Sequence, residues 1–177
     1  MIKIFDNVLE EQYLGLLNFG LNFFSWQIHW SGNTSEPPFF NTPVQNQMEY
    51  TYLFDIFKKK IGLNLAIGFS DLPVPYINLY PYGSAGGWHI DDGKEEEKPS
   101  KVNLTILFFP QQWKKKYKGE LLFKTGRKIE YKKNRLIAFS ANLAHRSETH
   151  FNPYNRYTIA YKTRVIKSLI PHPGAST

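Results

Sequence analysis

The 177-residue sequence predicts a mainly β protein, a jelly roll with helices on its N-terminal side. Two observations support this fold class. Helical spacing of apolar residues is confined to the part of the chain before Gly62, and from Pro73 onward the chain is a series of short strand-like runs. Turn signals such as Lys118-Gly119 and Asn152-Pro153 separate these runs. Many short strands at this spacing are typical of an antiparallel sandwich or barrel rather than of alternating strands and helices.

The N-terminal part supplies the predicted helices. Its strands alternate apolar and polar residues, whereas its helices have apolar residues three and four positions apart. The predicted elements are a strand over Ile2–Phe5, a helix over Val8–Phe19 with Asp6 as its N-cap, a strand over Phe24–Trp30 and a helix over Val44–Ile61. Ser31–Pro43 holds three prolines and a glycine, so we predict a loop there.

The later runs form the predicted jelly roll. They are Pro75–Tyr80, Val102–Phe109, Gly119–Phe123, Arg127–Tyr131, Arg135–Phe139 and Arg156–Arg164. No repeat or strong linker divides the chain. We therefore expect a single domain over residues 1–177, with helical support in 1–70, the jelly-roll core in 71–165 and a tail in 166–177.

Composition restricts the chemistry. Cysteine is absent, so a metal site must use His, Asp or Glu side chains. The net charge is +7, from 22 basic and 15 acidic residues, which permits a nucleic-acid partner without requiring one. The sequence shows no signal peptide and no apolar run of about 18 residues. We therefore expect a cytoplasmic protein with no membrane partner, and its oligomeric state is not predicted.

The sequence His89-Ile90-Asp91 is the main candidate metal site. In extended chain, residues two apart point to the same side, so His89 and Asp91 can reach one point. A histidine nitrogen and a carboxylate oxygen are two of the three ligands in the facial triad that binds non-haem Fe(II). His145, which follows the apolar run Leu136–Ser140, is the candidate for the third ligand. The alternative is a structural aspartate beside a partly buried imidazole.

Three other histidines are weaker candidates. His150 lies beside a turn and ranks below His145 as the third ligand. His29 is on the polar side of its predicted strand, and His172 is in the tail, so neither is expected to bind metal.

Arg156 opens the last predicted strand and can point into the barrel. A buried guanidinium without a partner is very costly, so this residue would need an anion. A ligand carboxylate held by two parallel hydrogen bonds would satisfy it. An aspartate at the barrel rim is the alternative partner.

The ordered set His89-Ile90-Asp91, His145 and Arg156 resembles the signature of the 2-oxoglutarate- and Fe(II)-dependent dioxygenases, and most closely their prolyl-hydroxylase-like branch. The resemblance covers roughly Asn78 to Lys162. Further matching elements are Tyr80-Pro81-Tyr82-Gly83 leading to Gly87-Trp88-His89, Asn103–Phe109, Gln112-Trp113, Gly119-Glu120-Leu121 and Asn134–Phe139.

This resemblance implies a double-stranded β-helix, or cupin-like, fold and an enzyme that hydroxylates a substrate C–H bond. Fe(II) would be the metal, 2-oxoglutarate and O₂ the cosubstrates, succinate and CO₂ the co-products, and ascorbate a candidate reductant. The implied site residues are His89, Asp91 and His145 for metal binding and catalysis, Arg156 with Tyr80 or Thr158 for 2-oxoglutarate, and Asn78, Trp88 and Trp113 in the substrate pocket.

The substrate is less well defined. The resemblance makes a peptidyl proline the first expected substrate, and another protein side chain or a small molecule the next. Many prolyl hydroxylases have a tyrosine where this chain has Gly86, and this difference weakens the transfer of a prolyl substrate from that branch to this chain. The nucleic-acid alkylation-repair branch is similar in Asn78-Leu79-Tyr80 but would have an arginine at Lys162, so an oxidative demethylase is the lesser alternative.

A non-catalytic jelly-roll binding module is the alternative from another class. The run Lys114–Lys118 is predicted to be a solvated hairpin, with nucleic-acid binding as its minor interpretation. The charged segment Asp92–Lys98 is predicted to be a loop near the mouth of the site.

Overall fold

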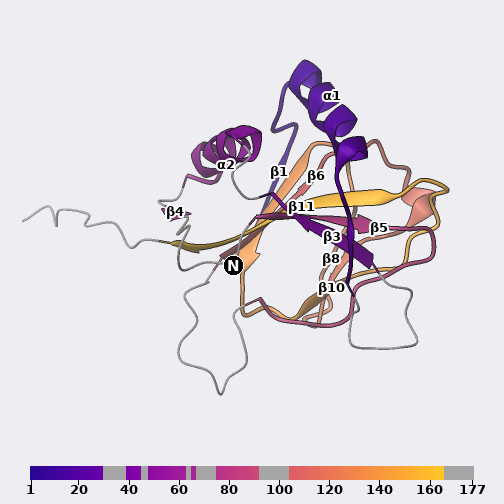
Figure 1. Ribbon diagram of the computed structural model, residues 1–177. Helices are drawn as coiled ribbons and strands as arrows, with labels where there is room; N and C mark the ends of the chain where they lie inside the picture. The colour runs from indigo at the N-terminus through magenta and orange to yellow at the C-terminus, as the bar shows by residue number, and fades with distance from the viewer. Residues whose placement is uncertain (30–38, 45–47, 63–64, 67–74, 92–103, 166–177) are drawn as a thin grey trace, which may run out of the picture.

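A computed structural model describes residues 1–29, 39–44, 48–62, 65–66, 75–91 and 104–165 (Figure 1). The helices are α1 (Glu11–Gly20) and α2 (Met48–Ile61), with 3-10 turns at Leu21–Phe23 and Lys115–Tyr117. The strands are β1 (Ile2–Asp6), β2 (Gln27–His29), β3 (Phe39–Pro43), β4 (Leu65–Ala66), β5 (Tyr76–Tyr80), β6 (Leu104–Phe109), β7 (Leu121–Phe123), β8 (Lys128–Ile129), β9 (Arg135–Ser140), β10 (His145–Ser147) and β11 (Arg156–Val165).

These strands form two antiparallel sheets. The larger has the order β1-β9-β6-β11-β5-β3-β2, with β4 also paired to β11, and the smaller has the order β10-β7-β8. Neighbouring strands in the large sheet come from distant parts of the sequence, since β11 lies between β5 and β6. The mainly β architecture predicted from the sequence is confirmed.

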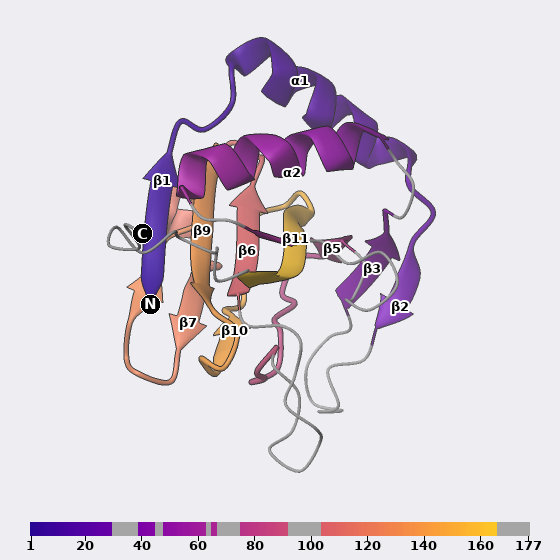
Figure 2. The ribbon, with the colours of Figure 1, turned by 90° about the vertical axis from the view of Figure 1, so that its left-hand side faces the viewer.

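Alternation along β11 gives the large sheet two different faces. Tyr157, Ile159 and Tyr161 are buried in the apolar core that the helices cover. The ring of Tyr161 contacts those of Phe54 and Phe57 on α2. Both helices lie on this side of the large sheet (Figure 2). Arg156, Thr158, Ala160 and Lys162 alternate with these residues and point to the other face, so β11 directs polar side chains toward the small sheet.

A second apolar core fills part of the space between the sheets. Phe123 of the small sheet packs edge-on against Phe139 of the large one. Trp113 and Phe109 contact the ring of Tyr131, which donates a hydrogen bond to the backbone oxygen of Tyr157. This core packs the two sheets against each other, and His145 contacts its rings Phe123 and Phe139.

The structure corrects some predicted elements. The predicted loop over Ser31–Pro43 contains β3, which pairs with β2 and β5. Its strand signal is obscured because proline occurs at its last position. The strand β10 was not predicted. Residues 30–38 lie outside the described part of the chain, as do the charged segment Asp92–Lys98 and the tail 166–177.

The predicted N-cap of the first helix is wrong. α1 begins at Glu11, because the Asn134 side chain accepts hydrogen bonds from the backbone N–H groups of Val8 and Leu9. Asp6 instead receives two hydrogen bonds from the Arg135 guanidinium, which lower the pKa of this carboxyl to about 2 despite its partial burial. The long-range contacts with β9 and its preceding turn therefore determine where the helix starts.

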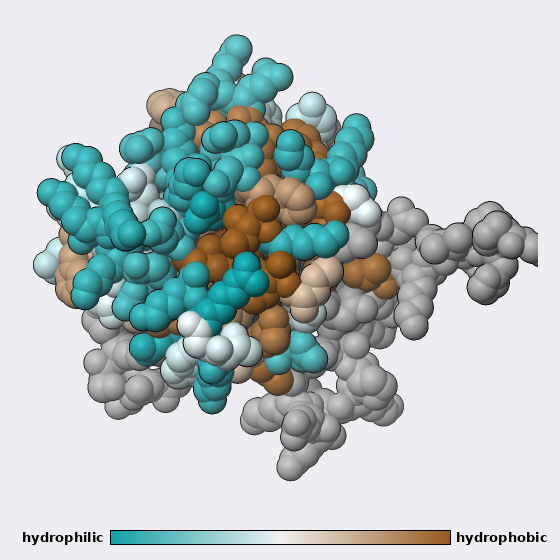
Figure 3. Space-filling model, turned by 180° about the vertical axis from the view of Figure 1, so that it is seen from behind, coloured by the Kyte–Doolittle hydropathy of each residue, from teal (hydrophilic) through white to brown (hydrophobic). Residues whose placement is uncertain are grey.

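The face of the molecule seen in Figure 3 has apolar atoms at its centre and hydrophilic side chains around them. β1 lies at one edge of the large sheet, where Met1 and Ile4 are exposed.

Within the described residues, neither helix is long and apolar enough to cross a membrane.

Candidate metal centre

The sheet pairing of two distant segments brings His89 and His145 together. The N–H of His89 donates to the carbonyl of His145 at 3.1 Å, and the reverse bond measures 2.9 Å. Asp91 is fixed two residues later by a 2.8 Å hydrogen bond from its N–H to the carbonyl of Ala141. The backbone thus positions all three side chains before any metal is considered.

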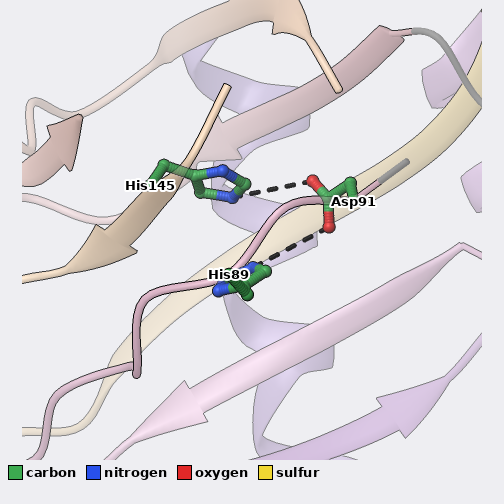
Figure 4. A group of neighbouring side chains, drawn as sticks. All are labelled: His89, Asp91 and His145. Carbon is green, nitrogen blue, oxygen red and sulfur yellow. Dashed lines mark ion pairs between the residues drawn. The ribbon is translucent and has the colours of Figure 1, made fainter. Parts of the chain in front are cut away.

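The three side chains converge on one point (Figure 4). Asp91 Oδ1 lies 3.8 Å from His89 Nε2, and Asp91 Oδ2 lies 3.6 Å from His145 Nε2. One ligand atom from each residue falls within 4.8 Å of the others. An ion with ligand distances near 2.1 Å would need the three atoms about 3 Å apart, so small side-chain adjustments would close the site.

Hydrogen bonds orient both imidazole rings. Nδ1 of His89 lies 2.9 Å from the carbonyl of Gly87, and Nδ1 of His145 lies 2.8 Å from that of Leu143. A carbonyl only accepts, so in each neutral ring we assign the proton to Nδ1. The lone pair of Nε2 then faces the carboxylate. Metal-binding histidines in proteins are oriented by this kind of bond.

The electrostatics favour the protonation states that bind metal. Burial raises the pKa of Asp91, but Lys162, His145 and the hydroxyl of Thr105 together bring it below its ordinary value. Burial lowers the pKa of His145, an effect that Asp91 only partly opposes. A carboxylate and a neutral imidazole therefore face each other at neutral pH, which is the donor set that a divalent ion requires.

Arg156 forms a second polar site within the barrel. Its side chain is buried, and Nη1 donates to the carbonyl of Gly119 at 2.7 Å. The guanidinium lies 4.3 Å from the ring centroid of Tyr80. Nε and Nη2 are buried without a hydrogen-bond partner, and burial lowers the pKa of this guanidinium. The predicted aspartate partner is not found among the described residues, so two donors remain for an anion.

The predicted neighbours of Arg156 lie on the same face of the sheet. Tyr80 is opposite Arg156 in the register of β5 and β11, and Asn78 is opposite Thr158. Asn78 Nδ2 lies 3.4 Å from Thr158 Oγ1, while its Oδ1 is buried without a hydrogen bond. The polar floor of this part of the barrel therefore continues from Arg156 along β11.

The two predicted pocket tryptophans have other contacts. Trp88 is exposed, and its ring lies beside the cationic groups of Arg146 and Lys124. Trp113 is buried and donates its indole N–H to the carbonyl of Lys118. Trp113 is thus part of the second apolar core, and a role of Trp88 in the substrate pocket stays a prediction.

His150, the lower-ranked candidate for the third ligand, has the surroundings of a structural residue. His150 is fully buried, and its Nε2 lies 2.8 Å from the carbonyl of Tyr80. It is not part of the group formed by the three candidate ligands. The ranking of His145 above His150 agrees with this geometry. The side chain of His29 and all of His172 lie outside what the structure describes.

Two residues that contact Asp91 were not predicted. Thr105 donates its hydroxyl hydrogen to Oδ2, and Lys162 Nζ lies 2.9 Å from Oδ1. Lys162 is six residues after Arg156 and has the same parity on β11, which is a signal that places it inside the barrel. Nothing in the sequence around Thr105 indicates its role.

A comparison with protein families identifies this arrangement. Residues 76–162 match the sequence profile of the 2OG-Fe(II) oxygenase superfamily. This part of the chain is a 2OG-Fe(II) oxygenase domain. It contains all three candidate metal ligands and Arg156. The family uses Fe(II) and 2-oxoglutarate, so the predicted family, enzyme class, metal and cosubstrate are confirmed. A search of curated protein sequences found no significant match.

Solved structures share the fold. A prolyl hydroxylase from Trichoplax adhaerens, in complex with a peptide of hypoxia inducible factor, has a TM-score of 0.72 and 14% identity over 93% of this chain and 83% of its own. A viral collagen prolyl hydroxylase of Paramecium Bursaria Chlorella virus-1 has a TM-score of 0.69 and 13% identity, over 93% of this chain and 96% of its own. HygX from Streptomyces hygroscopicus, with nickel, 2-oxoglutarate and hygromycin B bound, has a TM-score of 0.68 and 9% identity, over 94% of this chain and 83% of its own. The predicted jelly-roll fold is confirmed.

Proposed function

We propose that His89, Asp91 and His145 bind the Fe(II) of this oxygenase and that Arg156 binds the distal carboxylate of 2-oxoglutarate. The observation that carries the proposal is the convergence of one ring nitrogen from each histidine and one carboxylate oxygen of Asp91 within 4.8 Å. The donor set is the one expected for a facial triad, which occupies one side of the ion and leaves the others open.

The polar atoms of the barrel fit a dicarboxylate. The unpartnered Nε and Nη2 of Arg156 form one edge of a planar fork and match the two oxygens of a carboxylate. Tyr80 and Thr158 are beside Arg156 on the same face and can add hydroxyl hydrogen bonds. The unpartnered oxygen of Asn78 is a further polar atom that a ligand or an ordered water would satisfy.

When bound, Fe(II) supplies the oxidative chemistry by which 2-oxoglutarate and O₂ yield succinate, CO₂ and a hydroxylated C–H bond. The protein contributes geometry and exclusion of water. The contacts of Nδ1 of His89 and His145 with backbone carbonyls orient the rings so that Nε2 faces the carboxylate of Asp91, which Thr105 holds. The apolar core around His145 limits water on its side of the site.

A peptidyl proline is the substrate that we propose first. Among the similar structures, one holds a peptide of hypoxia inducible factor and another a small molecule, hygromycin B. Another protein side chain and a small molecule follow in this order, and a methylated base is the lesser alternative. The expected location in the cytoplasm stays a prediction.

Succinate formation and product mass test this proposal together. Candidate peptides, small molecules and methylated oligonucleotides are incubated with enzyme, Fe(II), 2-oxoglutarate and ascorbate, and analysed by mass spectrometry. A gain of one oxygen on proline supports the first substrate, whereas loss of a base methyl group with release of formaldehyde supports the last. Absence of 2-oxoglutarate turnover in the wild type, with or without substrate, would leave the binding-module alternative in place.

A further inference from the structure

Lys162 introduces a positive charge beside a proposed metal ligand. It lies on β11 six residues after Arg156 and on the same face, so about 20 Å of strand separates their Cα atoms. Its ammonium group lies 2.9 Å from Asp91 Oδ1 and 5.4 Å from the ring centroid of Tyr76. Only 21% of the Lys162 side chain is exposed, and 1% of the Asp91 side chain. This ion pair is therefore shielded from solvent.

The two oxygens of Asp91 have different partners. Thr105 and Lys162 are opposite each other in the register of β6 and β11, and each contacts one oxygen. Oδ2 accepts the hydroxyl hydrogen of Thr105. Oδ1 is close to the Lys162 ammonium but accepts no well-aligned hydrogen bond. A neutral donor thus holds one oxygen, and a full positive charge lies at the other.

This difference makes the oxygens unequal as metal ligands. A divalent ion on Oδ1 would lie within a few ångströms of the Lys162 ammonium, where repulsion between cations is strong in a shielded site. The hydroxyl on Oδ2 carries no net charge and leaves a lone pair free. Each oxygen lies near one histidine, Oδ2 at 3.6 Å from His145 Nε2 and Oδ1 at 3.8 Å from His89 Nε2, so the difference between the oxygens comes from Thr105 and Lys162.

We propose that Lys162 is a positioning residue that limits Asp91 to metal binding through one oxygen. The inference rests on the proposed function of the three metal ligands. With the ammonium in place, Asp91 occupies a single coordination position. Without it, both oxygens can bind the ion, which adds a ligand but removes one of the positions that 2-oxoglutarate and O₂ require. Lys162 therefore weakens metal binding and preserves space for the cosubstrate.

Calorimetric titration with Mn(II) in the absence of 2-oxoglutarate tests the metal half of the proposal. Groups that contact metal ligands change metal affinity by about 10- to 100-fold when replaced. We expect Lys162→Met to lower the Kd for Mn(II) by about tenfold, whereas Lys162→Arg, which keeps the charge, stays near the wild type. Lys59→Met on the exposed end of α2 is the matched control and should change nothing. The Mn(II)-dependent rise in Tm should also be larger in Lys162→Met, because tighter binding stabilises the folded state more.

Anaerobic titration of the Fe(II) proteins with 2-oxoglutarate tests the second half. We expect Lys162→Met to need about tenfold more 2-oxoglutarate for half-saturation of the visible charge-transfer band. An unchanged or higher Kd for Mn(II) in Lys162→Met would overturn the proposal, since it would make Lys162 a structural partner of Asp91 only. Tighter Mn(II) binding with unchanged 2-oxoglutarate affinity would overturn it as well. If the wild type binds no Mn(II), the proposed function fails, and this inference fails with it.

Discussion

Replacement of Arg156 by alanine should weaken 2-oxoglutarate binding without preventing metal uptake. The Arg156 side chain is 1% exposed and has two buried nitrogens without partners. A carboxylate there would accept two charge-assisted hydrogen bonds in a shielded pocket, and truncation of one partner in such a pair costs ~2–5 kcal/mol. At 1.4 kcal/mol per tenfold change, this corresponds to roughly thirty-fold to several-thousand-fold in affinity.

The assay is anaerobic titration of each Fe(II) protein with 2-oxoglutarate, followed by the visible charge-transfer band. Arg156→Lys should be intermediate, because lysine keeps the charge but not the planar fork. Arg156 also donates to the carbonyls of Gly119 and Glu148, so Mn(II) calorimetry and Tm must show that the variants are folded. Arg146→Ala, next to Trp88 outside the barrel, is the matched control.

Two outcomes of this titration would contradict the assignment of Arg156 to 2-oxoglutarate binding. Unchanged 2-oxoglutarate affinity in folded Arg156→Ala would show that the guanidinium does not bind the cosubstrate. A large loss in Arg164→Ala instead would show that the predicted inward face of the last strand has the wrong residues.

Three further variants test neighbouring features. Gly119→Ala should raise the 2-oxoglutarate Kd at least about tenfold by the same titration, because its φ is +85° and a Cβ there would lie 2.8 Å from Arg156 Nη1; wild-type affinity would contradict this. His150→Gln should retain Mn(II) binding in calorimetry, since His150 contacts a backbone carbonyl, and loss of binding in a folded variant would make it a ligand. Asp6→Asn should lower the free energy of unfolding by about 1 kcal/mol in urea at pH 7. The folded-state pKa of Asp6, about 2, is below its unfolded value of 3.8, so Arg135 stabilises the fold above pH 4 and this contribution is lost as the pH falls toward 2. An equal deficit at pH 7 and pH 2 would exclude this charge effect.

The sequence predicted the candidate site best where strand geometry alone decides the outcome. The two-residue period brings His89 and Asp91 to one side, and it places Arg156 inside the barrel. The structure brings His145 to the same point, as predicted, through its backbone pairing with His89. The orientation of His89, Asp91 and Arg156 depends on local chain direction, whereas His145 was selected because it follows an apolar run and matches the family signature.

Features that depend on register between distant strands could not be predicted. The contacts of Thr105 and Lys162 with Asp91 require the observed pairing of β6 and β11. The start of α1 likewise depends on Asn134, more than 120 residues away in the chain. A single sequence specifies such contacts only through the completed fold, because local propensity does not encode the register between strands.

Trp88 was placed in the substrate pocket by the family resemblance and not by strand geometry. Neighbouring residues of an extended segment point to opposite sides, however, and the ring of Trp88 contacts Lys124 and Arg146 instead. The alternation that puts His89 and Asp91 on one side puts Trp88 on the other, and its place in the substrate pocket stays a prediction.

The measurement that tests the central claim most directly is the visible spectrum after anaerobic addition of Fe(II) and 2-oxoglutarate. The wild type should develop a metal-to-ligand charge-transfer band that saturates at one Fe(II) per chain. His89→Ala, Asp91→Ala and His145→Ala should each abolish it, whereas the matched variant His29→Ala should retain it. A wild type without this band, or an Asp91→Ala variant in which the band persists at full intensity, would contradict the assignment of His89, Asp91 and His145 as the iron ligands.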